Sequence, residues 1–159
     1  MRIRLVQQAL AAAAALASAC GAPPPPGPPE VRYGEDVCRF CGMIVSDERF
    51  GVAALMSGEG GRAEMRLYDD VGCLLADLER SEAVPVQIWV KAFATGEWLE
   101  AREALFVRDE AIASPMLSGI AACASPADPP CGGRPPATLL RWDLLRGLGA
   151  AALPSRGGS

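Results

Sequence analysis

The stretch from residue 50 to residue 93 constrains the fold more than any other part of the chain. Phe50 to Met56 is expected to form a strand, and Arg62 to Tyr68 alternates apolar and polar residues as a partner strand would. Between them, the run Ser57-Gly58-Glu59-Gly60-Gly61 is a strong turn signal. The pattern therefore predicts a β-hairpin.

A helix and a further strand are expected directly after this hairpin. Asp69 and Asp70 are placed to cap a helix over Val71 to Arg80, because short acidic side chains accept hydrogen bonds from the first free N–H groups of a helix. Val84 to Phe93 is the strongest strand of the chain, and Ala104 to Val107 is a shorter one. The residues expected on one side of the long strand are Val84, Val86, Ile88 and Val90. A mixture of strands with helix predicts an α+β fold.

The second half of the chain echoes the first half. Met43 precedes Gly60-Gly61-Arg62, and Met116 precedes Gly132-Gly133-Arg134 at nearly the same spacing. We therefore expect two ββαβ-like repeats packed in one small domain, with Met43 and Met116 at equivalent positions. The second copy is interrupted by residues 125–136, which are rich in proline and glycine.

The N-terminus has the pattern of an export signal. Residues 1–19 combine two arginines with an apolar core that is shorter than the roughly 20 residues needed to span a bilayer. The residues before Cys20 resemble a lipoprotein signal, which predicts that Cys20 is lipidated; the alternative is an ordinary secretory signal cut near Ala19. We expect an exported protein that an acylated Cys20 holds on the outer, periplasm-facing side of a bacterial membrane.

The rest of the chain divides into a linker, a domain and a tail. Residues 20–30 contain a proline run that favours a semi-stiff polyproline II spacer. Residues 31–150 are expected to form the domain, and residues 151–159 a disordered tail. The formal net charge is −4 and Lys91 is the only lysine, which argues against a nucleic-acid partner.

The stretch Cys38-Arg39-Phe40-Cys41-Gly42-Met43 carries the candidate chemistry. It places three sulfur side chains within six residues, in a chain with no histidine. Thiolate and thioether are soft ligands that select Cu(I), so we predict one bound Cu(I) with a thiolate from Cys41 and a thioether from Met43. Met116 is the predicted ligand from the second half, and Cys38 is an accessory sulfur.

Other interpretations of the cysteines stay open. Cys38 and Cys41 form a CxxC pair, which would also suit a thiol–disulfide oxidoreductase, although no helix is expected to follow it. Cys73 is expected to be a small buried residue of its helix, and a Cys₄ zinc site would need it together with Cys123 or Cys131. Cys123 and Cys131 flank a proline-rich loop and could instead form a disulfide.

The chain also lacks the usual signs of an enzyme. No histidine can act as a general base, and no glycine-rich phosphate loop precedes a helix. A structural module whose cysteines only join loops is a third interpretation.

Several segments together resemble the NosL family of exported copper-binding lipoproteins. They are Cys38-Arg39-Phe40-Cys41-Gly42-Met43, Leu67-Tyr68-Asp69-Asp70-Val71-Gly72-Cys73-Leu74-Leu75, Trp98-Leu99-Glu100-Ala101 with Ala104-Leu105-Phe106-Val107, and Ser114-Pro115-Met116. The resemblance implies a copper-binding α+β domain of two ββαβ-like halves. It implies a metallochaperone that delivers Cu(I) to an exported cuproenzyme, in nitrous oxide reductase maturation, together with an ABC-type membrane assembly complex. Cys41 and Met43 match the family's CGM motif and Met116 its second-half Pro-Met motif, which leaves the third ligand to Met116, Cys38 or a partner.

Overall fold

The computed structural model describes residues 26–58, 62–81 and 84–149. The predicted signal peptide, the lipidation site Cys20 and the tail at residues 151–159 lie outside these ranges. Within the described part of the chain, no helix is both long and apolar enough to cross a bilayer.

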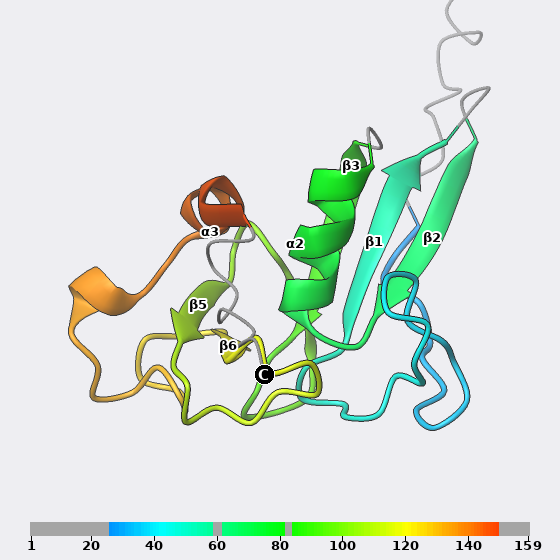
Figure 1. The fold of residues 1–159 in the computed structure, drawn as a ribbon. Coiled ribbons are helices and arrows are strands. Elements are labelled where there is room, and N and C mark those ends of the chain that lie inside the picture. Colours follow the sequence, from blue (N-terminus) through cyan, green and yellow to red (C-terminus); the bar gives the residue numbers. More distant parts are fainter. Residues whose placement is uncertain (1–25, 59–61, 82–83, 150–159) are drawn as a thin grey trace, which may run out of the picture.

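The main sheet has four antiparallel strands in the order β2-β1-β3-β4, with helix α2 lying across one face (Figure 1). The bounds of these elements are β1 Val52–Ser57, β2 Ala63–Tyr68, α2 Val71–Arg80, β3 Pro85–Lys91 and β4 Trp98–Glu100. The hairpin, the helix and the following strand were all predicted. The α+β class is therefore confirmed.

Strand β1 is the centre of the core because both of its faces are buried. Val52, Ala54 and Met56 belong to the large core cluster that includes α2. The alternate residues Ala53 and Leu55 pack with a smaller cluster on the other face. Successive side chains of a strand point to opposite faces, so an apolar run without alternation is what a central, doubly covered strand requires.

Helix α2 begins at the residue that the sequence predicts. The Asp70 side chain accepts a hydrogen bond from the backbone N–H of Cys73 at 3.0 Å and so caps the first turn. The Asp77 carboxylate accepts from the Tyr68 hydroxyl at 2.7 Å and from the Arg66 guanidinium at 3.2 Å. The Asp77 contacts tie the second half of α2 to β2.

A second, two-stranded sheet packs beside the first. It pairs β5 (Leu105–Arg108) with β6 (Ile120–Cys123) and is joined to the main sheet by a parallel bridge between Ala92 and Ala122. A short 3-10 helix, η2 (Pro136–Thr138), and helix α3 (Trp142–Leu148) complete the described fold.

Only the second half of β3 contributes to the core, because Ile88 and Val90 are buried whereas Val84 and Val86 at its start are mostly exposed. Two ββαβ-like repeats are not confirmed. The first half forms such a unit. In the second half, no strand follows α3 in the described residues. The segment that corresponds to β2 pairs only through Leu140, in an isolated bridge. Its prolines remove the N–H donors that a ladder needs.

Candidate metal centre

The loop that carries Cys38 and Cys41 is closed by its own backbone. The N–H of Cys38 donates to the carbonyl of Met43 at 2.8 Å, and the N–H of Gly42 donates to the carbonyl of Cys38 at 3.0 Å. Gly42 has φ +73°, a left-handed conformation that suits glycine. This tight turn, which the Val37–Ile44 bridge encloses, brings the two cysteines close together.

Two backbone N–H groups, one in this loop and one shortly after it, donate hydrogen bonds to the junction between β2 and α2. The N–H of Arg39 donates to the carbonyl of Leu67 at 2.8 Å. The N–H of Ser46 donates to the Asp69 carboxylate at 2.8 Å. The loop is therefore held against the N-terminus of α2, where Cys73 lies in the first turn.

Three free cysteines meet at this junction. The Sγ atoms of Cys38, Cys41 and Cys73 all lie within 4.8 Å of one another. Cys38 and Cys73 are buried, and Cys41 is half-buried. We call this group the three-cysteine cluster. Three sulfurs at such separations can converge on one soft metal ion, with Cys41 on the accessible side.

Hydrogen bonds and burial shift the pKa values of the three thiols in different directions. The Cys73 thiol donates to the Cys38 sulfur, and this bond, helped by backbone N–H donors, lowers the pKa of Cys38. The same bond and burial raise the pKa of Cys73. Burial is the main reason why the pKa of Cys41 is raised. Negative charge among the three thiols of the metal-free protein therefore concentrates on Cys38.

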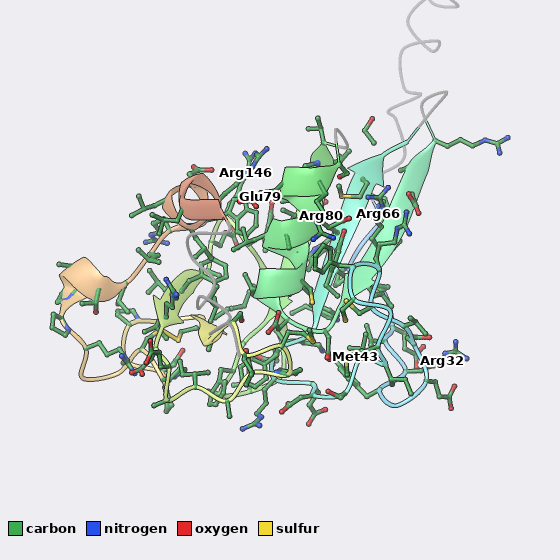
Figure 2. The ribbon with its side chains drawn as sticks, in the orientation of Figure 1. Arg32, Met43, Arg66, Glu79, Arg80 and Arg146 are labelled. Atoms are coloured by element: carbon green, nitrogen blue, oxygen red, sulfur yellow. A yellow bond between two sulfur atoms is a disulfide. The ribbon has the colours of Figure 1, made fainter. Side chains whose placement is uncertain are left out.

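The two predicted methionines differ in their exposure. Met43 is 57% exposed, at the end of the loop, on the same side of the molecule as the N-terminus of α2 (Figure 2). Met116 is half-buried against the core cluster that includes Cys38 and Cys73. Its backbone N–H donates to the Asp70 carboxylate at 3.2 Å. Coordination by Met43 and Met116 stays a prediction.

The site residue that sequence reasoning missed is Cys73. It is buried, as expected, but its sulfur belongs to the cluster. The available signal was the cap at Asp70: a cysteine three residues after a helix cap lies in the first turn, and helical side chains point back towards the N-terminus.

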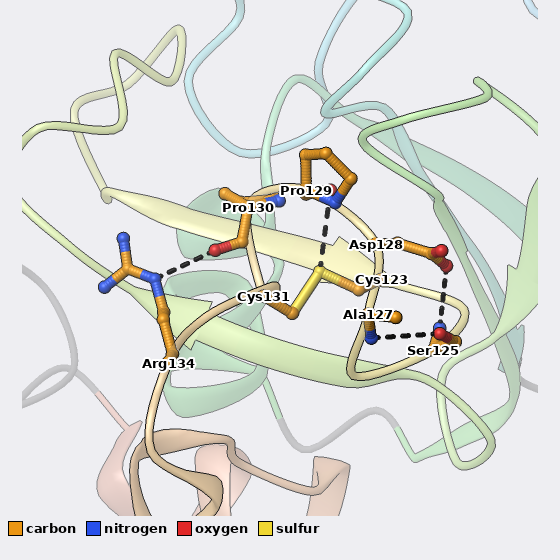
Figure 3. Close-up of a disulfide and its surroundings, with 8 residues drawn as sticks. All are labelled: Cys123, Ser125, Ala127, Asp128, Pro129, Pro130, Cys131 and Arg134. Carbon is orange, nitrogen blue, oxygen red and sulfur yellow. Dashed lines mark hydrogen bonds between the residues drawn. A yellow bond between two sulfur atoms is a disulfide. The ribbon is translucent and has the colours of Figure 1, made fainter.

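The last two cysteines take no part in this site. Cys123 and Cys131 form a disulfide that closes the loop after β6 (Figure 3). A Cys₄ zinc site built with either of them is therefore wrong. The open possibility of a disulfide between these two cysteines is confirmed.

Fold and site together define a small α+β domain with a sulfur-only candidate metal centre. Among solved structures, it is similar to the crystal structure of the copper chaperone NosL from Shewanella denitrificans. The two share 19% sequence identity with a TM-score of 0.59, over 75% of this chain and 96% of that chain. At this identity the likeness establishes the fold. No family model and no curated protein matches the chain.

Proposed function

We propose that this protein is a metallochaperone that carries one Cu(I) ion as cargo and transfers it to an exported copper enzyme. The observation that carries the proposal is the three-cysteine cluster, which gathers three sulfur ligands at one partly open position. The likeness in fold to a copper chaperone supports the proposal.

The donor set favours Cu(I) over other metals. Zinc sites usually have four ligands in a tetrahedron, often with histidine, whereas this chain has no histidine and the cluster has three thiols. Cu(I) is soft and prefers thiolate and thioether sulfur. Met116 and Met43 would supply thioethers beside the cluster.

Transfer requires an accessible ligand, and Cys41 is that ligand. Cys38 and Cys73 are 1% and 3% exposed, so an incoming sulfur of an acceptor would reach the metal from the side of Cys41 and Met43. Ligand exchange of this kind makes and breaks only metal–sulfur bonds, so no catalytic acid or base is needed.

The cellular setting completes the proposal. Cys20 would anchor the protein to the outer face of a bacterial membrane, and the proline-rich residues 20–30 would separate anchor and domain. The acceptor would be an exported cuproenzyme, such as nitrous oxide reductase, or its ABC-type membrane assembly complex.

Copper titration tests the proposal directly. The full chain with Cys20→Ser, which cannot be lipidated, is expected to bind one Cu(I) per chain in competition with a Cu(I) chelator. Cys41→Ser is expected to bind much more weakly, and Met43→Leu moderately more weakly. Native mass spectrometry of the same samples gives the metal, its stoichiometry and the number of free thiols. If both variants bind as tightly as the parent, the proposal fails.

Alkylation of the reduced protein separates a copper carrier from a thiol–disulfide oxidoreductase. We expect iodoacetamide to modify Cys41 first, because Cys38 and Cys73 react only after local opening. Because burial raises the pKa of Cys41 above its ordinary value of 9.0, the rate should still be rising above pH 9. Bound Cu(I) should protect Cys41. Rapid labelling of Cys38 that added Cu(I) does not block would favour the oxidoreductase.

A further inference from the structure

The buried carboxylate of Asp70 joins the first turn of α2, which carries Cys73, to the loop that carries Met116. Oδ1 of Asp70 accepts from the N–H of Cys73 at 3.0 Å, at the start of α2. Oδ2 of the same side chain accepts from the Ser114 hydroxyl at 2.9 Å and from the N–H of Met116 at 3.2 Å. Asp70 is fully buried, and no ion pair in the described part of the chain involves it.

A helix cap alone does not explain this arrangement. A cap needs one acceptor oxygen, which serine or asparagine supplies as well as aspartate. A buried carboxylate carries a large desolvation cost that only further hydrogen bonds offset. The bonds that offset it here come from the loop that contains Met116, so the second oxygen serves to hold that loop.

Ser114 also forms hydrogen bonds within the loop that contains Met116. Its hydroxyl accepts from the N–H of Gly119 at 3.2 Å and lies 3.1 Å from the Ser118 hydroxyl. The N–H of Leu117 donates to the Ser114 carbonyl at 2.9 Å. Through Ser114, Asp70 therefore holds the whole turn around Met116.

We propose that Asp70 is a positioning residue that fixes Met116 beside the three-cysteine cluster, so that the thioether can join the thiolates on one Cu(I) ion. This inference rests on the proposed function. Without the link, the turn around Met116 would lose the hydrogen bonds that join it to the start of α2, and ordering it on each binding event would weaken the affinity.

The test uses the full chain with Cys20→Ser and three further substitutions. Asp70→Asn keeps one acceptor oxygen, which can still cap α2, but presents an amide NH₂ to the N–H of Met116. Ser114→Ala removes the link from the loop side. Ser125→Ala is the control, because it makes the same truncation at a hydroxyl that accepts from the N–H of Ala127 in the loop after β6, away from this network.

Chelator competition should show Cu(I) affinity falling roughly tenfold or more in Asp70→Asn and in Ser114→Ala, the range typical of residues that orient metal ligands. The double variant should be no weaker than the weaker single variant, because both changes break one link. In a Met116→Leu background, Asp70→Asn should have no further effect. Ser125→Ala should bind like the parent.

A second measurement reports on Met116 itself. With ¹³C-methyl methionine, Cu(I) should shift the Met116 methyl resonance in the parent and in Ser125→Ala, and no longer do so in Asp70→Asn or Ser114→Ala. A lower melting temperature alone would not produce this selective loss. Unchanged affinity and an unchanged Met116 shift in both variants would overturn the inference but leave the proposed function intact. Cu(I) binding that is indifferent to Cys41→Ser would overturn the proposed function itself.

Discussion

Replacing Cys73 with alanine is expected to weaken Cu(I) binding on the order of a hundredfold. Structural zinc sites gain roughly 10–16 kcal/mol in total, which is about 2.5–4 kcal/mol for each of four ligands. Since about 1.4 kcal/mol corresponds to a factor of ten in affinity, losing one ligand costs roughly two to three orders of magnitude. Cys38→Ala should have a similar effect, because its sulfur belongs to the same cluster.

The comparison needs a control that removes a sulfur elsewhere. Met65 packs with Trp89 in the small cluster on the opposite face of the sheet, so Met65→Leu should leave Cu(I) binding unchanged. Affinity is measured by chelator competition, and the melting temperature of the metal-free protein reports any loss of stability. If Cys73→Ala binds like the parent while Met116→Leu loses affinity, the ligand set is Cys41, Met43 and Met116 without the buried thiols.

The first half of the fold was predictable because its signals are local. The cap at Asp70 and the apolar positions of the helix agree on where α2 begins, and the structure starts α2 at Val71. The hairpin was visible from its turn and from the flanking strands. The exposure of the residues at the start of β3 was not visible, because Val84 and Val86 have the same strand pattern as the buried Ile88 and Val90.

The second half could not be derived from its echo of the first half. Sequence similarity between segments does not show whether a strand has a partner. The segment expected to match β2 contains Pro135 and Pro136, which form the start of η2 and its cap. The strand that did form, β6, pairs with β5 of the preceding segment.

The candidate site was predictable in its chemistry but not in its full set of sulfurs. Cys41 and Cys38 were found because they share one short motif. Cys73 joins them only because Arg39 and Ser46 hold the loop against the end of β2 and the start of α2. Such a long-range contact leaves no periodic pattern in the sequence, so Cys73 was expected only to be buried.

Removing the Cys123–Cys131 disulfide is expected to destabilise the protein by about 2.5 kcal/mol, the chain-entropy value for a loop of about eight residues. For a domain of this size, the melting temperature should fall by roughly 10 °C. The change is Cys123→Ala together with Cys131→Ala, measured by thermal unfolding in parallel with the parent. The parent unfolded and refolded under strong reductant should melt close to the double variant.

Copper binding should survive this change. The disulfide belongs to the core cluster of Phe50 and Val107, which is separate from the cluster that contains Cys38 and Cys73. The loop also keeps other contacts, since the Arg134 guanidinium donates to the Pro130 carbonyl at 2.9 Å and to the Asp109 carboxylate at 2.6 Å. The double variant should therefore bind Cu(I) with the affinity of the parent at temperatures well below its melting point. An unchanged melting temperature would show that these contacts alone hold the loop, whereas a loss of Cu(I) affinity would show that the two halves are coupled through it.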